Sequence, residues 1–239
     1  MTKGHPHSAL WWSVFWILAA LVAVSGALVP LDRSIGAVLS RFGNRVPASN
    51  LIWVVGGIPI TGLAVLGAAW RRNRWRLVLA FLGGLLVEAL AKHFIATPLP
   101  KATFEPPFYR HLETFTNITP KMVLSWVAVV IPMHGASAKA HVALFRGSFP
   151  SGHVFRLTYA SGAWLFRRRR WTWAIALVAG TLVVATGGHW ALDAAGGFLL
   201  ARALLAFVDS VSRGQSEPRG ARSSRSNFRD REEAQHRSR

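Results

Sequence analysis

Residues 148–155 read SFPSGHVF, a small polar turn containing His153 that interrupts an otherwise apolar sequence. The whole chain has 239 residues, of which 51% are hydrophobic, and its mean hydropathy is +0.30. The apolar residues fall into long runs and do not alternate with polar ones, a pattern that indicates membrane-spanning helices. A histidine in such a setting needs a specific explanation.

The apolar runs on both sides of this turn predict six membrane-spanning helices. A span needs roughly 20 apolar residues, because about 30 Å of hydrocarbon is crossed at 1.5 Å per residue. The last three runs are shorter or begin with polar residues. We therefore expect an all-α, polytopic membrane bundle of six helices, with short extra helices in the outer loops. The predicted spans are Ala9–Val29, Leu51–Trp70, Leu77–Ala96, Ser151–Phe166, Trp171–Gly187 and His189–Val208.

Basic residues give the chain a net charge of +18, which raises the question of a nucleic-acid partner. Their positions argue against one: RRNRWR (71–76) follows the second span, RRRR (167–170) follows the fourth, and the Arg-rich tail follows the sixth. With a cytoplasmic amino terminus, all three clusters fall on the cytoplasmic side, as the positive-inside rule expects. We therefore predict a multi-pass protein of the cell membrane with both termini cytoplasmic, attracted to anionic lipid and without a nucleic-acid partner.

The sequence divides into a membrane domain, residues 1–209, and a tail, residues 210–239. The Arg-rich tail has almost no apolar residues to bury, so we expect a disordered cytoplasmic segment. Residues 32–45 predict a short amphipathic helix at the outer surface. In the long loop before His153, residues 122–133 are too short to cross comfortably and predict a re-entrant or interfacial segment. The chain has no cysteine, which excludes disulfides and thiolate metal sites.

Ionisable side chains inside the predicted spans are candidates for function, because inserting one into hydrocarbon costs roughly 2.5 to 3.5 kcal/mol. Glu88 and Lys92 lie four residues apart on one predicted helix, in the order that favours a mutual ion pair. Plain neutralisation of Lys92 is the simpler explanation for Glu88, which lies deeper in the span. Lys92 lies nearer the outer end, where it can serve a site.

The sequence GGHWALDAAGG, residues 187–197, places His189 and Asp193 one helical turn apart. A carboxylate at this spacing can orient and charge-stabilise the imidazole while the second ring nitrogen faces a substrate. A structural pair at a helix start is the alternative. In the PSGH turn, Gly152 allows a ligand to approach the backbone, and Ser151 lies near a predicted helix start, where an anion can bind.

Three blocks occur in order at the outer ends of predicted spans: KHFIATPLP (92–100), FPSGH (149–153) and GHWALD (188–193). Together they resemble the signature motifs of the type 2 phosphatidic acid phosphatase family, whose six-helix membrane fold is related to the vanadium haloperoxidases. The resemblance covers residues 1–208 in topology, but its specific residues lie in the three blocks. It implies a metal-independent lipid phosphate phosphatase without a cofactor, with its active site on the extracytoplasmic face.

The resemblance implies a role for each catalytic residue. His189 would attack phosphorus and form a phosphohistidine, and Asp193 would fix the tautomer of His189. His153 would protonate the leaving oxygen, and water would then hydrolyse the intermediate. No metal ion is needed in this scheme.

The resemblance also implies a phosphate-binding set, from which this chain departs. Lys92, Ser151 and the Gly152 backbone would bind phosphate oxygens. The two motif arginines fall on Leu99 and Val183, so both guanidinium groups are missing. Their loss is expected to reduce the rate, because a planar guanidinium is well suited to grip phosphate oxygens.

Other cations are candidates to replace these arginines. Arg156 lies three residues after His153, hence on the same helix face, and Lys101 and Arg146 flank the motif blocks. We expect Arg156 to bind phosphate. The alternative is a charge that snorkels to the membrane surface or sets topology.

The predicted substrate is a phosphate monoester or diphosphate of a lipid; phosphatidic acid, phosphatidylglycerol phosphate and polyprenyl diphosphate are candidates among which the motifs do not choose. One alternative is a degenerate, non-catalytic member that binds or moves lipid phosphates. The missing arginines favour it, and the retained His153, His189 and Asp193 oppose it. A vanadate-dependent haloperoxidase is a third reading. The sequence does not indicate an oligomeric state.

Overall fold

The computed structural model describes residues 8–43, 51–95, 97, 147–165 and 169–214, and every regular element in these ranges is a helix. The remaining residues, including 122–133 and the tail from 215, lie outside the description. The helices are α1 (Ser8–Ser25), α2 (Val29–Gly43), α3 (Leu51–Val55), α4 (Ile58–Arg72), α5 (Arg76–Phe94), α9 (Gly152–Trp164), α10 (Arg169–Ala185) and α11 (Ala191–Gly214).

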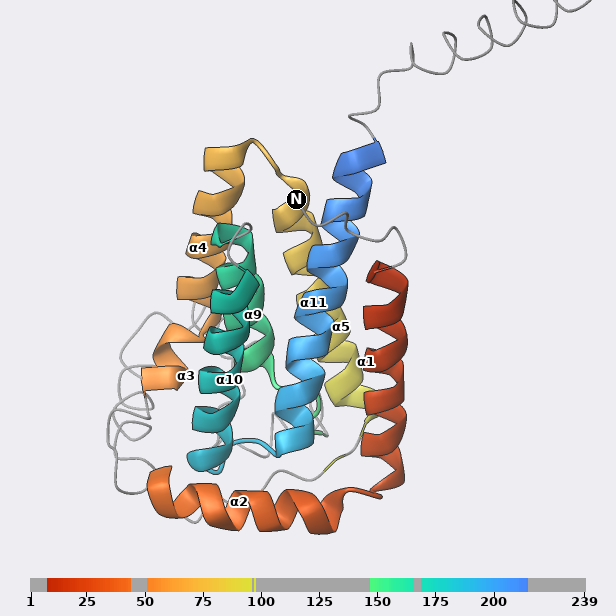
Figure 1. Ribbon diagram of the computed structural model, residues 1–239, viewed down its shortest axis with the longest axis vertical. Coiled ribbons are helices and arrows are strands. Elements are labelled where there is room, and N and C mark those ends of the chain that lie inside the picture. The colour runs from red at the N-terminus through yellow and green to blue at the C-terminus, as the bar shows by residue number, and fades with distance from the viewer. Residues whose placement is uncertain (1–7, 44–50, 96, 98–146, 166–168, 215–239) are drawn as a thin grey trace, which may run out of the picture.

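The helices form one bundle, in which α1, α4, α5, α9, α10 and α11 run along the long axis while α2 lies across one end (Figure 1). We call that end the α2 end, and the opposite end, where α11 reaches Gly214, the tail end. The central helices are α9 and α11: α11 packs against α1, α5, α9 and α10, and α9 packs against α4, α5, α10 and α11.

The prediction of an all-α membrane fold is confirmed in its main features. Among the residues that the structure describes, three helical segments are long and apolar enough to cross a bilayer, namely α1, α5 and residues 191–212 of α11, and residues 170–185 of α10 form a shorter apolar helix. Many large apolar side chains on the outside of the bundle are exposed, as lipid-facing residues are.

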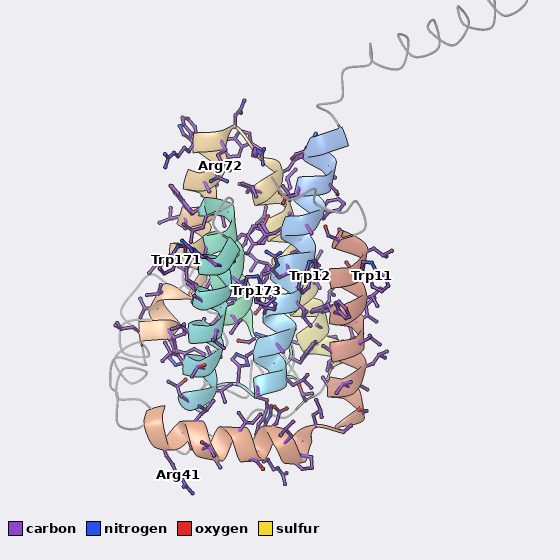
Figure 2. All side chains as sticks on the ribbon, in the orientation of Figure 1. Trp11, Trp12, Arg41, Arg72, Trp171 and Trp173 are labelled. Atoms are coloured by element: carbon purple, nitrogen blue, oxygen red, sulfur yellow. The ribbon has the colours of Figure 1, made fainter. Side chains whose placement is uncertain are left out.

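Tryptophans with exposed or partly exposed rings gather in the half of the bundle near the tail end. Trp11 and Trp12 lie on α1, and Trp171 and Trp173 lie on the first turns of α10, with Arg72 at the nearby end of α4 (Figure 2). Trp11 and Trp171 are half exposed or more, at 58% and 50%. Tryptophan beside arginine is typical of the boundary between hydrocarbon and lipid headgroups.

The predicted second span, Leu51–Trp70, is wrong as one continuous helix. It is divided into α3 and α4 at Gly56 and Gly57, and Pro59 occupies the first turn of α4. Glycine is a poor helix former and proline favours a first turn, so the break follows from the local sequence. The break leaves the Gly56 carbonyl free to accept a bond from another helix.

The predicted fourth span is shorter than expected, because α9 has 13 residues. At 1.5 Å per residue it spans about 20 Å, less than a hydrocarbon core. Its first turn therefore lies inside the bundle and not at its end (Figure 1). Nearly all of α9 is buried, including His153, Arg156 and Tyr159.

Two other boundaries differ from the sequence prediction. The helix expected at residues 32–45 starts earlier, at Val29, and its described part ends at Gly43. The last helix, predicted as a span over His189–Val208, starts at Ala191 and continues to Gly214. Helix ends depend on capping and packing, which apolar runs do not reveal.

An apolar core fills the tail-end half of the bundle between α4, α5, α9 and α11. At its centre the rings of Phe81, Phe155 and Tyr159 pack together, with 5.6 Å between the centroids of Phe81 and Tyr159. The Tyr159 hydroxyl donates a hydrogen bond of 2.9 Å to the carbonyl of Leu77, which ties α9 to α5. This core holds the central helix in place and so positions the first turn of α9.

Candidate active site

Backbone hydrogen bonds bring the three motif blocks together at the first turn of α9. The Ser151 amide donates to the carbonyl of Asp193 at 2.8 Å, which joins the PSGH turn to α11. The Gly147 amide donates to the carbonyl of Lys92 at 2.9 Å, which joins the same segment to α5. A Cβ at Gly197 would overlap the Ser151 carbonyl, so this close approach needs glycine. The turn is thus held between α5 and α11.

The two predicted catalytic histidines lie side by side. The ring centroids of His153 and His189 are 6.5 Å apart, and each residue is 1% exposed. The Nδ1 atom of His189 lies 3.4 Å from Oδ2 of Asp193. The same oxygen accepts a hydrogen bond of 3.0 Å from the Trp190 amide. Asp193 therefore caps the start of α11 and also lies beside the His189 ring, so the structural interpretation of this pair fits the contacts and the activating role stays a prediction.

Glu88 is the centre of a buried charge cluster. Its Oε1 accepts a hydrogen bond of 2.8 Å from Lys92 Nζ, and its Oε2 lies 3.2 Å from Nη1 of Arg156. A Cβ at Gly152 would overlap the Glu88 carboxylate, which places the cluster directly beneath the first turn of α9. Glu88 therefore holds two cations at this turn, whereas the sequence indicated only neutralisation of Lys92.

Arg156 points into the bundle. It is fully buried, its Nε donates to the carbonyl of Gly56 at 2.9 Å, and its Nη1 pairs with Glu88. A guanidinium held by two helices at this depth does not snorkel to the membrane surface, so the topological alternative does not fit. The break between α3 and α4 supplies the carbonyl that fixes this side chain.

Trp53 is a neighbour of the site that the sequence did not reveal. Its ring lies edge-on to His153 at 4.5 Å between centroids and stacks over His189 at 6.2 Å. A tryptophan three residues before the Gly56–Gly57 break was the available signal, but its partners come from other helices. The indole limits the movement of both imidazoles.

Several polar atoms at the first turn of α9 lack a partner. Within the described part of the chain, Ser151 Oγ, His189 Nε2 and Arg156 Nη2 are buried without a hydrogen bond, and neither ring nitrogen of His153 makes a well-formed one. Buried polar groups without partners are rare and expensive unless they face a ligand. The first amides of α9 have no acceptor within their own helix, which adds donors for an anion. The arrangement suits a phosphate-sized anion.

Not every predicted residue can be placed. Leu99, Lys101 and Arg146 lie outside the described residues. Val183, at the position of the second motif arginine, is fully buried in an apolar cluster with Ile52. Among the residues that the structure describes, no group of three or more histidine, aspartate or glutamate side chains is placed to hold a metal ion.

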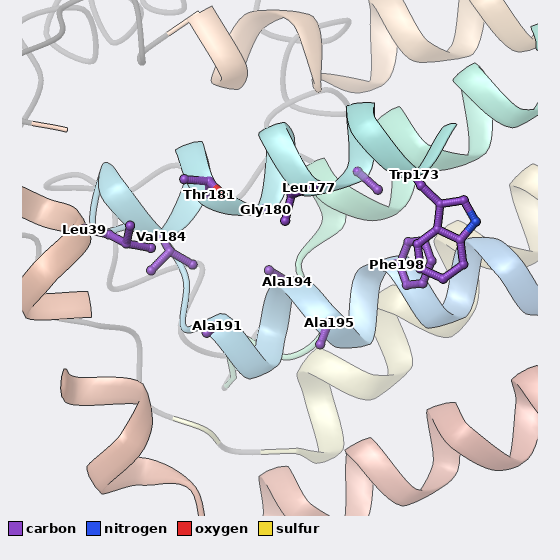
Figure 3. A pocket seen from close by; sticks show the side chains of 11 residues that line it. Leu39, Trp173, Leu177, Gly180, Thr181, Val184, Ala191, Ala194, Ala195 and Phe198 are labelled. Carbon is purple, nitrogen blue, oxygen red and sulfur yellow. The ribbon is translucent and has the colours of Figure 1, made fainter. Parts of the chain in front are cut away.

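An apolar groove of about 300 Å³ lies beside the site, between α10 and α11. Trp173 and Phe198 close one end, where their ring centroids are 4.5 Å apart, and Leu39 of α2 lies at the other (Figure 3). Its wall includes Ala194, the residue after Asp193, but it contains no ionisable side chain. The groove is therefore separate from the polar cluster.

No protein-family model and no curated protein match this chain. Its fold does match a solved one, the crystal structure of the first transmembrane PAP2-type phosphatidylglycerolphosphate phosphatase from Bacillus subtilis. The TM-score is 0.57 and the sequences are 17% identical, with 89% of this chain and 100% of that chain covered. The membrane fold implied by the three sequence blocks is confirmed by this match.

Proposed function

We propose that this protein, which has the fold of PAP2-type membrane phosphatases, hydrolyses a phosphate monoester or diphosphate of a membrane lipid through a phosphohistidine on His189. The observation that carries the proposal is the set of buried, unpartnered polar atoms of Ser151, Arg156 and His189 around the first turn of α9. These groups come from α9, from the segment just before α11 and from the PSGH turn, and a phosphate would satisfy them together.

In the first step, His189 Nε2 attacks phosphorus. The N–P bond forms as the bond from phosphorus to the lipid oxygen breaks, and His153 gives its proton to that oxygen. Asp193 holds the Nδ1 side of the His189 ring at 3.4 Å and stabilises the positive charge that develops on the ring. In-line transfer needs both imidazoles near one phosphate, which agrees with their centroid separation of 6.5 Å.

In the second step, water attacks the phosphohistidine. His153, now neutral, takes a proton from the water as the new P–O bond forms, and the N–P bond breaks to release phosphate and restore His189. Ser151 Oγ, the Gly152 amide and the cations Lys92 and Arg156 would bind the non-bridging oxygens in both steps. This set uses Arg156 in place of the missing motif arginines.

The location of the site supports a lipid substrate. The reactive groups are buried at the start of a helix that begins inside a membrane bundle, so a headgroup reaches them while its chains stay in the hydrocarbon. The residues of the site recognise the phosphate and not the lipid. The choice among phosphatidic acid, phosphatidylglycerol phosphate and polyprenyl diphosphate therefore has to be made by assay.

The distribution of basic residues supports an orientation with the site on the extracytoplasmic face. Arg71, Arg72, Arg74 and Arg76 lie around the connection of α4 to α5 at the tail end, together with the start of α10 (Figure 1). The positive-inside rule places that end in the cytoplasm. Both termini would then be cytoplasmic, and the α2 end would face outward.

The test is phosphate release by the purified protein from vesicles that contain each candidate lipid phosphate, with and without chelator. We expect release from at least one substrate, unchanged by chelator, and a phosphoenzyme that is labile in acid and stable in base. A strict magnesium requirement would contradict the proposed chemistry and favour a metal-held phosphate. Tight binding of lipid phosphate without turnover would favour the non-catalytic alternative.

A further inference from the structure

The first turn of α11 lacks the side chain that usually caps a helix. Trp190 precedes Ala191, and its carbonyl accepts the first bond of the helix, from the Ala194 amide at 3.1 Å, so Trp190 occupies the N-cap position. An indole has no acceptor to offer the free amides of the next residues. Asp193 satisfies the Trp190 amide, but the amide of Leu192 needs a partner from elsewhere.

Asp32 of α2 supplies that partner across 160 residues of sequence. Its Oδ1 accepts a hydrogen bond of 3.1 Å from the Leu192 amide, and it also interacts with the amide of Ala191. The side chain is 7% exposed. Burial raises the pKa of the Asp32 carboxyl, because removal from water penalises its charged form. A negative group here also complements the positive end of the α11 dipole.

Apolar contacts at this corner come from Ile35 and Leu39 of α2 and from Ala191 of α11, which pack against one buried apolar cluster. A cavity of about 360 Å³ lies between α1, α2, α5 and α11, and its wall includes Asp32, Leu192 and Asp193. Side chains beside a space of this size lose the close contacts that fix a packed helix end. The hydrogen bonds that Asp32 accepts therefore add a polar tie between α2 and the first turn of α11 to these apolar contacts.

We propose that Asp32 is a positioning residue for the reaction, which acts by fixing the first turn of α11 and, through it, Asp193 and His189. The part of this inference that concerns kcat rests on the proposed function. The same turn also carries the Asp193 carbonyl that accepts from the Ser151 amide, so its displacement would move the histidine and the phosphate-binding turn together.

The first experiment compares Asp32→Ala and Asp32→Asn with the unaltered protein in lipid vesicles. Asp32→Ala should lower kcat roughly tenfold, the scale of losing a helix cap, with KM changed less than about twofold. Asp32→Asn keeps an acceptor oxygen, so kcat should stay within about threefold. Arg33→Ala is the matched control, because Arg33 lines the same cavity. An equal loss in both Asp32 variants would overturn the capping role.

The second experiment needs no activity. Hydrogen exchange of the peptide that contains residues 187–197 should be faster in Asp32→Ala than in the unaltered protein and unchanged in Asp32→Asn. If the unaltered protein releases no phosphate but this exchange pattern holds, the proposed function fails while the tie between α2 and α11 stands. Unchanged exchange in Asp32→Ala would overturn the inference whatever the activity.

A double-variant cycle tests whether Asp32 acts through Asp193. In the Asp193→Asn background, Asp32→Ala should lower kcat less than about threefold, because the group that it positions is already altered. A full tenfold loss in that background would show that Asp32 acts by another route and would overturn the positioning role.

Discussion

Both halves of the bundle bury apolar side chains, but they differ in the charged and polar side chains that they bury. The half that contains the first turns of α9 and α11 buries charged and polar groups, among them Lys92, Arg156 and His189, each at most 2% exposed. The tail-end half buries an apolar cluster centred on Phe81 and Tyr159. The same helices, α5, α9 and α11, run through both halves.

Because of this difference, we expect the apolar half to contribute mainly to stability and the polar half mainly to catalysis. Packed apolar side chains contribute to stability, whereas buried polar groups without partners reduce it and are retained where they act on a ligand. The tail-end half thus holds the helices together, and the site half keeps groups such as His189 Nε2 unsatisfied. Substitutions in the two halves should therefore affect different measurements.

The largest expected effect is on catalysis, from His189→Ala. Loss of the nucleophile should reduce phosphate release by roughly four to six orders of magnitude, the scale of removing a nucleophile that acts as part of a unit. Thermal unfolding in detergent should change little or rise, because a buried imidazole nitrogen without a partner is removed. His93→Ala, at a histidine that lies edge-on to Phe94, is the matched control and should keep turnover within about threefold. Appreciable phosphoenzyme in His189→Ala would contradict the assignment.

The next largest effect is expected from Arg156→Ala. This substitution should lower both catalysis and stability, so it does not follow the division between the two halves of the bundle. It should cost on the order of 2 to 4 kcal/mol of transition-state stabilisation, measured from kcat/KM. It should also lower stability, because Glu88 loses one of the two cations that the described part of the chain places beside it. Arg156→Lys should rescue only partly, since it restores the charge without the planar geometry.

A double variant separates the two losses of Arg156→Ala. Adding Glu88→Gln removes the uncompensated buried charge, so stability should recover in part while turnover stays low. Recovery of near-normal kinetics by the double variant would show that Arg156 serves only to neutralise Glu88.

The third effect lies in the tail-end half. Phe81→Ala should destabilise the protein by about 3 to 5 kcal/mol, because it leaves a cavity against Phe155 and Tyr159. Turnover per folded molecule should stay within about threefold, as measured by kinetics below the unfolding transition. Phe81→Leu, which leaves a smaller space, is the graded control. A large loss of kcat at intact stability would mean that the two halves are not independent.

The smallest effect is expected from ending the chain after Gly214. The proposed site lies toward the α2 end, whereas α11 ends at the tail end (Figure 1). Turnover on vesicles should therefore change less than about twofold, and retention of α11 should preserve the fold. A loss greater than tenfold in well-inserted protein would place the tail near the site.

Part of the site could be predicted because some of its residues are close in sequence. Glu88 and Lys92 lie four residues apart on α5, where helix geometry brings them together, and His189 lies just before the start of α11, within reach of Asp193 in its first turn. The partnership of Arg156 with Glu88 and Gly56 could not be predicted, because it joins three helices. Trp53 was missed for the same reason.

The sequence by itself determined that this is an all-α membrane protein and marked its PSGH and HxxxD segments as candidates for the site, since run length and residue spacing are local properties. Only the tertiary structure decided that α3 and α4 separate at Gly56, that Glu88 pairs with Arg156, and that Asp32 caps α11. Such contacts join residues distant in sequence, and they depend on how the helices pack.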